Sequence, residues 1–255
     1  MIAILSPAKN LNTEKLKKEI KNTSQPQFLS EAEILMQQLK KMKAKDISKF
    51  MQLSPKLADL NYERFQNWEN THTNKNAKPA ILTFNGDAYT GLQADDFTQQ
   101  ELDYAQKHIR ILSGLYGLLS PLDIIQPYRL EMGKPLKTKG NKDLYSFWDN
   151  KISTALNTAI AESGSPYLVN VASNEYYKAV QQKNINATVI NCTFKEYKNG
   201  EYKSIMVFLK KARGYMCRFI VKNKINNPKD LLAFEMDGYV YNPKLSKEND
   251  LVFTR

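Results

Sequence analysis

The stretch RILSGLYGLLSPLD, residues 110–123, decides how the middle of the chain is expected to fold. It places Gly114 and Gly117 inside an apolar run, in a chain that has only 10 glycines. A glycine in a helix interior costs up to about 1 kcal/mol relative to alanine. We therefore expect these glycines to mark a turn or to leave backbone amides accessible.

The residues on either side of the two glycines predict helices. Thr98 and Glu101 form a capping-box pattern that begins the first helix. Ser120 and Pro121 are typical of the cap and the first position of a second, shorter helix. The inward stripe of the first helix comprises Leu102, Ala105, Ile109 and Leu112. The segment SGLYG would then join two helices as a helix–hairpin–helix-like element.

A helix–hairpin–helix holds the sugar–phosphate backbone of nucleic acid through exposed amides and does not read bases. The usual hairpin has one apolar residue between its glycines, and here an extra residue separates Gly114 from Gly117. The pattern leaves two interpretations open, a phosphate-binding hairpin and an ordinary corner in the core. The hairpin residues are Ser113, Gly114, Leu115, Tyr116 and Gly117.

Length and composition indicate a globular chain. The 255 residues are 42% hydrophobic and 25% charged, and they contain no evident repeat or linker, so we expect one domain over residues 1–255. No apolar stretch reaches the roughly 20 residues that a membrane span requires. The first residues, MIAILSPAKN, lack a basic leader, and we therefore expect a cytoplasmic protein with no membrane partner.

The charge balance points to a polyanionic partner. Lys and Arg number 37 against 26 Asp and Glu, which gives a net charge of +11. Only two cysteines and two histidines are present, so a disulfide framework and a His-rich metal site are not expected, although carboxylates could hold magnesium. The sequence also has no P-loop or dinucleotide fingerprint, and we expect neither a cofactor nor a bound metal.

The remaining segments predict a mixed α/β (α+β) fold, with a central mixed sheet surrounded by helices. Apolar residues at helical spacing predict helices between residues 30 and 68. Residues 187–214 predict a hairpin turned at Asn199 and Gly200. Further strands are expected at residues 2–6, 79–84, 167–173, 237–243 and 250–255.

Residues 210–224 predict a basic helix that has six basic residues and no acidic residue. Lys211, Arg218 and Lys222 align on one face, and Gly214 lies beside that row. A glycine among positive charges would let a phosphate approach the backbone. The other interpretation is a solvated, lysine-rich surface helix, but like charges stacked one turn apart favour a binding surface.

Seven segments, in order along the whole chain, resemble the bacterial peroxide stress protein YaaA family. They are LSPAK (5–9), FNGDAYTGL (84–92), RILSGLYGLLSPLDIIQPYRLEMG (110–133), LYSFW (144–148), VNVASNEYYKAV (169–180), KKARGYMCRFI (210–220) and LVFTR (251–255).

The resemblance implies a bacterial protein that protects against hydrogen peroxide and helps to limit free iron. It also implies sequence-nonspecific binding of duplex or branched DNA, through a positively charged cleft and a helix–hairpin–helix at residues 113–117 on an unusual α/β fold. Ser120 departs from the basic residue expected in relatives, so one phosphate contact would be missing. The cleft would include Lys9, Lys210, Lys211, Arg213 and Arg218.

An enzyme acting on damaged DNA or on a nucleoside-type substrate is the alternative function. Lys9 would attack a sugar carbon, as in a glycosylase or lyase, and Asp87 would manage protons. Such a Lys9 would need burial among other cations to lower its pKa. In the structural interpretation, Asp87 caps a turn and Arg129 forms a buried ion pair with Glu131. The candidate catalytic or ligand-binding residues are Lys9, Asp87, Tyr89, Tyr128, Arg129, Glu131, Asn174 and Glu175.

Overall fold

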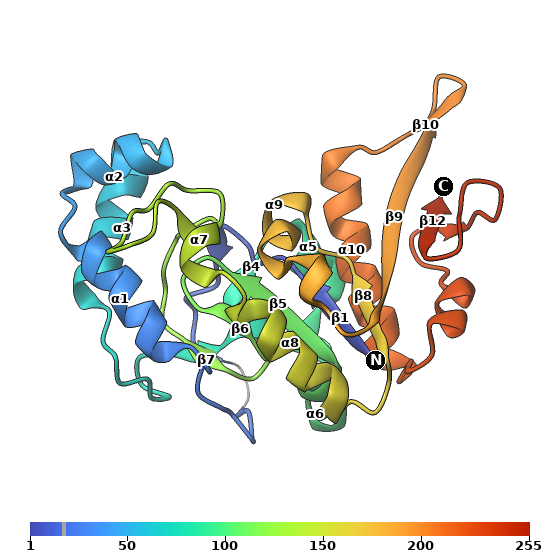
Figure 1. The fold of residues 1–255 in the computed structure, drawn as a ribbon, viewed down its shortest axis with the longest axis horizontal. Helices are drawn as coiled ribbons and strands as arrows, with labels where there is room; N and C mark the ends of the chain where they lie inside the picture. The colour runs from blue at the N-terminus through green and yellow to red at the C-terminus, as the bar shows by residue number, and fades with distance from the viewer. Residues whose placement is uncertain (17–18) are drawn as a thin grey trace.

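A computed structural model describes residues 1–16 and 19–255, and its centre is an eight-stranded sheet (Figure 1). The strand order is β11-β12-β9-β8-β1-β5-β6, with β10 paired to β9 beside this path. The strands are β1 (Ile2–Leu5), β5 (Ile109–Ser113), β6 (Gly117–Leu119), β8 (Tyr167–Asn170), β9 (Thr188–Lys198), β10 (Glu201–Lys203), β11 (Val240–Tyr241) and β12 (Asp250–Thr254).

The sheet is mixed, as the sequence predicts. Strand β1 is completely buried and lies parallel to β5 on one side and to β8 on the other. Strands β8, β9 and β12 continue the parallel arrangement, whereas β6, β10 and β11 pair antiparallel with their neighbours. Two small two-stranded sheets pair β2 (Asn10–Leu11) with β4 (Phe84–Asn85) and β3 (Lys78–Pro79) with β7 (Ile124–Ile125).

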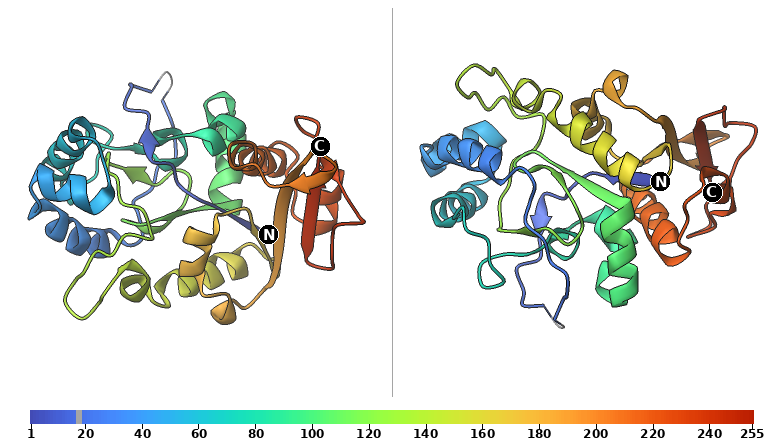
Figure 2. Two further views of the ribbon diagram at one scale, coloured as in Figure 1. Left: turned by 90° about the horizontal axis from the view of Figure 1, so that it is seen from above. Right: turned by 60° about the horizontal axis from the view of Figure 1, so that its bottom comes forward.

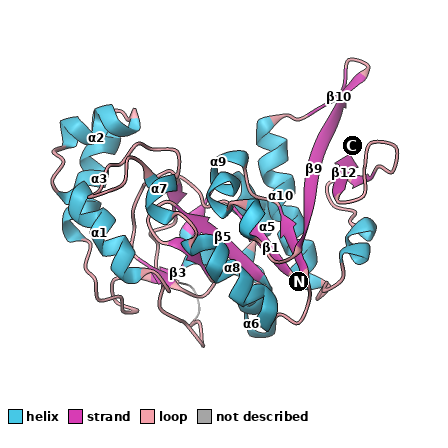
Figure 3. Cartoon of the chain, viewed as in Figure 1, coloured by secondary structure: helices cyan, strands magenta, loops and turns pink. Residues whose placement is uncertain are grey.

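Helices cover both faces of the central sheet. Figure 2 shows α6 and α10 on one side and α8 and α9 on the other. Helices α1, α2 and α3 gather at one end of the molecule (Figure 3). The helices are α1 (Leu29–Lys40), α2 (Ala44–Met51), α3 (Pro55–Asn67), α4 (Ala80–Thr83), α5 (Asp87–Leu92), α6 (Gln99–His108), α7 (Leu144–Trp148), α8 (Lys151–Glu162), α9 (Asn174–Tyr177) and α10 (Met206–Lys222). Short 3₁₀ turns are η1 (Ala94–Asp96), η2 (Lys178–Val180), η3 (Gln182–Asn184) and η4 (Pro228–Ala233).

Two local sequence signals, one for a helix cap and one for a turn, are confirmed. The Thr98 hydroxyl accepts from the Glu101 amide, and the Glu101 carboxylate accepts from the Thr98 amide, as a capping box requires. Asn199 and Gly200 both have positive φ, 55° and 85°, at the turn between β9 and β10. The second arm of this hairpin is short, because α10 begins at Met206.

The predicted helix–hairpin–helix is wrong, because residues 109–119 form a β-hairpin. Helix α6 ends at His108, and β5 pairs with β6 so that Ser113 faces Gly117. The apolar spacing that predicts a continuing helix belongs to a strand buried beside β1, where Ile4 lies opposite Arg110. A short apolar run does not distinguish a buried strand from a buried helix.

The two glycines of this hairpin allow close packing in the core. Gly117 has a φ of 66°, and a Cβ there would lie 2.6 Å from the ring of Trp148. A Cβ on Gly114 would lie 2.2 Å from the Leu130 carbonyl oxygen. The Trp148 indole donates to the Gly114 carbonyl at 3.0 Å. All the residues from 113 to 117 are buried, so their amides are not presented to a DNA backbone.

The polar groups of the hairpin are used within the core. The Tyr116 hydroxyl accepts from the Trp68 indole and bonds to His72 Nε2, both at 2.9 Å. Burial raises the pKa of Tyr116 well above its ordinary value and lowers the pKa of His72 to about 4. Ser113 Oγ accepts from the Tyr116 amide and bonds to the Tyr128 hydroxyl at 2.6 Å. The ordinary buried corner is therefore the correct interpretation of SGLYG.

Two further predicted elements differ in the structure. Residues 80–83 form the one-turn helix α4 in place of a strand, and the first two amides of this helix, those of Ala80 and Ile81, donate to carbonyls of residues 123 and 121. Ser120 does not cap a second helix. Its amide donates to the Asp123 carboxylate at 2.7 Å, which closes a turn before β7, and burial raises the pKa of Asp123 to about 6.

Candidate functional site

A cavity of about 690 Å³ lies at the carboxyl ends of strands β1 and β8. Leu5 at the end of β1 and residues 6–10 after it line the cavity, as do residues 173–176, which come after β8. The Ser6 and Ser173 loops are tied together, because the Ser173 amide donates to Ser6 Oγ at 2.8 Å. The other lining residues are Asn85, Gly86, Asp87, Ala88, Arg129, Glu131, Met206, Leu209, Lys210 and Arg213.

The sheet topology explains why a cavity forms here. From β1 the chain reaches β5 and β6 on one side of the sheet, and then it crosses back to β8 and β9 on the other side. Connections that leave a central strand in opposite directions open a crevice outside the carboxyl ends of the strands. Ligands of open α/β sheets bind at such switch points.

A buried ion pair forms one wall of the cavity. Arg129 Nε and Nη2 both donate to Glu131 Oε1, at 3.2 and 3.0 Å. Lys9 Nζ lies 3.6 Å from the same oxygen, at the end of a side chain that is 65% exposed. Glu131 is only 7% exposed, and its Oε2 has no hydrogen-bond partner among the described residues. The predicted Arg129–Glu131 pair is present, and it leaves one carboxylate oxygen unused.

Helix α10 supplies two cations to the opposite wall. Lys210 is 51% exposed and lies 4.0 Å from Asp87 Oδ2. Arg213 is mostly buried, and burial lowers the pKa of its guanidinium. The Arg213 Nε has no hydrogen-bond partner, and Arg213 takes part in none of the ion pairs, within the described ranges 1–16 and 19–255.

Of the remaining candidate residues, Asn174 and Glu175 line the cavity, whereas Tyr89 and Tyr128 do not. Glu175 Oε1 accepts from the Gly133 amide at 2.9 Å, and Asn174 begins helix α9 beside it. The Tyr89 hydroxyl donates to the carbonyl of Ser6, a residue that lines the cavity, and burial raises the pKa of this tyrosine. Tyr128 is directed to Ser113 in the core. The two tyrosines therefore support the cavity and do not line it.

The basic face predicted on residues 210–224 is divided in the structure. Lys210 and Arg213 reach the cavity, whereas Lys211 Nζ lies 5.4 Å over the ring of Tyr215. Arg218 forms a two-pronged pair with Asp96, at 2.7 and 2.9 Å. Lys222 also lies 3.3 Å from Asp96 and 3.0 Å from Glu101.

The absence of acidic residues within the segment was misleading, because acids from η1 and α6 neutralise its far end. The hydrogen bonds from Arg218 lower the pKa of Asp96, and the Thr98 amide together with Lys222 lowers the pKa of Glu101. Gly214 does not open the backbone to phosphate. It is buried where α10 crosses α5, and a Cβ there would lie 1.7 Å from the Ala88 carbonyl oxygen.

Sequence reasoning missed two asparagines that line the cavity. Asn10 and Asn85 line the cavity and belong to the paired strands β2 and β4. Arg64 of α3 does not line the cavity, but burial and the charge of Arg129 lower the pKa of its guanidinium. Asn85 lies in the FNGD segment next to Asp87, which is a usable signal, but only the fold brings Arg64 near.

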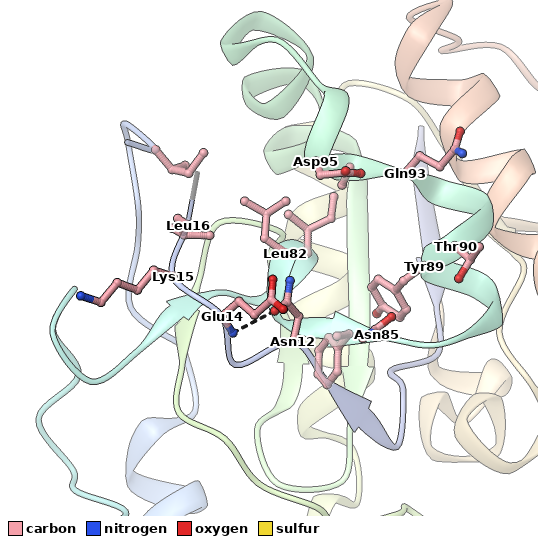
Figure 4. Close-up of a pocket in the computed structure, with 14 residues that line it drawn as sticks. Asn12, Glu14, Lys15, Leu16, Leu82, Asn85, Tyr89, Thr90, Gln93 and Asp95 are labelled. Carbon is pink, nitrogen blue, oxygen red and sulfur yellow. Dashed lines mark hydrogen bonds between the residues drawn. The ribbon is translucent and has the colours of Figure 1, made fainter. Parts of the chain in front are cut away.

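A second pocket, of about 430 Å³, lies on another part of the surface (Figure 4). Its wall includes Glu14, Lys15 and Asp95, and the Glu14 amide donates to Asn12 Oδ1 at 2.9 Å. Tyr89 separates the two pockets, since its ring faces this one and its hydroxyl meets Ser6. No residue of this pocket is among the candidates predicted from the sequence, apart from Tyr89.

Among residues 1–16 and 19–255, no group of three or more His, Cys, Asp or Glu side chains is placed to hold a metal ion. In the same part of the chain, no helix has both the length and the hydropathy that a membrane crossing needs.

Comparison with known proteins identifies the family. Residues 1–245 match the family described as "Peroxide stress protein YaaA". A "UPF0246 protein" of Saccharophagus degradans is 49% identical over 255 residues, which cover 100% of this chain and 99% of the relative. A "UPF0246 protein" of Tolumonas auensis is 50% identical over 255 residues, which cover 100% of this chain and 98% of the relative. The chain therefore belongs to the peroxide stress protein YaaA family.

Proposed function

We propose that the protein binds DNA in the response to peroxide, with the phosphate backbone lying across the mouth of the β1–β8 cavity. Membership of a peroxide stress family is consistent with a stress-response role. The sugar–phosphate backbone would be held by Lys9 and Lys210 at the rim and by Arg213 in the wall. The binding would be independent of base sequence, because the contacts are to phosphate.

One observation carries this proposal: cations about 200 residues apart in sequence line one cavity. Lys9 and Lys210 hold their ammonium groups at the surface, where a phosphate can reach them. Arg213 is a mostly buried cation without an acidic partner among the described residues, and a planar guanidinium suits a phosphate group. The net charge of +11 would favour association with any polyanion.

The cavity supports binding better than it supports the lysine-based enzyme. A nucleophilic lysine needs burial among other cations, but Lys9 is 65% exposed and its nearby partner is the Glu131 carboxylate. Asp87 pairs with Lys210, at 4.0 Å, and not with Lys9. The buried hairpin at residues 113–117 has no part in this proposal.

The test is the salt dependence of affinity for a fluorescent duplex. Affinity falls as salt rises, so the slope of log affinity against log salt is negative. Replacing both Lys9 and Lys210 with alanine should make this slope shallower by about 2, because each lost phosphate contact contributes about 0.9. The matched control replaces Lys45 of α2 and Lys244, two exposed lysines outside the cavity, and should leave the slope unchanged.

The two double variants have the same net charge, so a general loss of positive charge would weaken both equally. Equal effects of the cavity pair and the control pair would contradict the proposed location. Failure of the unsubstituted protein to bind any duplex at low salt would contradict the function itself.

A further inference from the structure

We propose that the β1–β8 cavity takes up a single nucleotide unit, with its phosphate on Arg213 and an N–H group of its base on Glu131 Oε2. This inference rests on the proposed function, because it names the chemical group that the same site would receive. The nucleotide would be either free or unpaired from a bound DNA strand.

The Glu131 carboxylate supplies the hydrogen-bond acceptor of the proposed site. Glu131 is fixed by Arg129 and approached by Lys9, and both cations act on Oε1. Oε2 is left as a buried acceptor on a residue that lines the cavity, without a partner among the described residues. A buried charged acceptor without a hydrogen bond is costly, so such an atom marks the place where a ligand donates one. The ligand must therefore carry an N–H or O–H donor.

The Arg213 guanidinium supplies the cation of the proposed site. Arg213 lines the same cavity, and its Nε lacks an acceptor among residues 1–16 and 19–255. The other arginine of the cavity wall, Arg129, is paired with the Glu131 carboxylate. An arginine placed in this way suits an anion with two oxygens, such as phosphate. Lys210, three residues earlier on α10, adds a second positive charge at the rim.

The volume of the cavity and its apolar lining also suit a nucleotide. A ligand that carries both an anionic group and a hydrogen-bond donor could be as small as an amino acid. The cavity, at about 690 Å³, has room for a larger molecule. That volume lies within the range of nucleotide and cofactor sites, roughly 300 to 1,000 Å³. Apolar groups for the flat faces of a base come from Leu5, Pro7, Ala8, Ala88 and Leu209. A nucleotide joins these requirements in one molecule.

The experiment measures binding of deoxyadenosine 5′-monophosphate and of deoxyribose 5-phosphate, which lacks the base. The unsubstituted protein should bind the nucleotide at least about tenfold more tightly, as expected for a charge-assisted hydrogen bond. Glu131→Gln keeps an oxygen for Arg129 and should reduce this ratio toward one without weakening the sugar phosphate. Arg213→Gln should weaken both ligands. Circular dichroism and thermal unfolding of each variant check that it is folded.

Binding to duplex DNA distinguishes a free nucleotide from a nucleotide that is unpaired from a DNA strand. A duplex with one unpaired nucleotide should bind more tightly than a fully paired duplex, and Glu131→Gln should remove this preference if the site takes its nucleotide from DNA. If the preference is absent but the monophosphate binds as expected, the site takes a free nucleotide.

The failures of the two proposals are distinguishable. Equal binding of nucleotide and sugar phosphate, or an unchanged ratio in folded Glu131→Gln, overturns the inference while salt-dependent duplex binding still supports the proposed function. Tight nucleotide binding without any duplex binding overturns the proposed function and supports the inference. Preferential binding of a free α-amino acid overturns the nucleotide assignment.

Discussion

Replacing Gly214 with alanine sets two effects of opposite sign against each other. In an exposed helix the substitution would stabilise the protein by about 1 kcal/mol, because alanine has the higher helix propensity. In the structure, Gly214 meets α5, where the new Cβ would lie 1.7 Å from the Ala88 carbonyl oxygen and 2.8 Å from the Leu92 amide nitrogen. Ordinary contact begins at 3.4 Å, so the two helices must move apart.

The steric clash should outweigh the gain in helix propensity, so Gly214→Ala should lower the free energy of unfolding. Its partners are backbone atoms of a packed helix, which cannot turn away as the end of a flexible side chain can. Overpacking of this kind costs about 3 kcal/mol or more, and subtracting the gain in propensity leaves a net loss of about 2 kcal/mol or more. For a chain of this size the melting temperature should fall by about 4 to 8 °C.

Urea unfolding followed by circular dichroism measures this change. Gly91→Ala should act in the same direction, because its Cβ would lie 2.2 Å from the Lys211 carbonyl oxygen on the other side of the same crossing. Gly200→Ala is the control, since the hairpin tip has open space and only the φ of 85° opposes a side chain, at about 1 kcal/mol. An increase in stability on Gly214→Ala would refute the packing argument and restore an exposed glycine on the basic face.

Three further predictions concern buried polar groups. Tyr116→Phe should lower the free energy of unfolding by about 2 kcal/mol in urea titrations, because the Trp68 indole N–H loses its acceptor in the core. The pKa of His72 in the folded protein is about 4, so the unfolded chain binds a proton more readily and stability should fall as the pH drops from about 6.5 to 4. Over that range the difference in unfolding free energy between the unsubstituted protein and His72→Gln should shrink. A constant difference would contradict this prediction. Arg213→Met should raise the unfolding free energy by about 1 kcal/mol while weakening DNA binding, because it removes a buried charge without an acidic partner in the described chain; a loss of stability would show that Arg213 has a structural partner.

Two local features of the fold were predictable from the sequence, because each depends on neighbouring residues. The capping box at Thr98 and the turn at Asn199 each use contacts within four residues, and both are confirmed. Strand β5 depends on a partner about 100 residues away, because it pairs with β1. Its apolar residues also fit the helical spacing of α6, so only the tertiary pairing separates strand from helix.

The candidate site shows the same division. The sequence indicated which polar residues could act together, and the fold brings Lys9, Asp87, Glu131 and Lys210 to one cavity. It could not indicate which charges would be neutralised, since Arg218 meets an acid more than 100 residues away. The state of Glu131 Oε2 likewise depends on how the Arg129 side chain is directed.

The glycines that resemble a phosphate-binding motif act instead on the cavity wall. Gly114 lets the hairpin approach the backbone of Leu130 and Glu131, to within 2.2 Å and 3.2 Å of a virtual Cβ, and so it fixes the segment that carries the carboxylate. Gly214 brings α10, with its cations, against α5, which begins at Asp87. Both walls are therefore set by backbone contacts that only glycine permits. Enlarging either glycine should change the separation of donor and acceptor in the cavity even though neither residue touches a ligand.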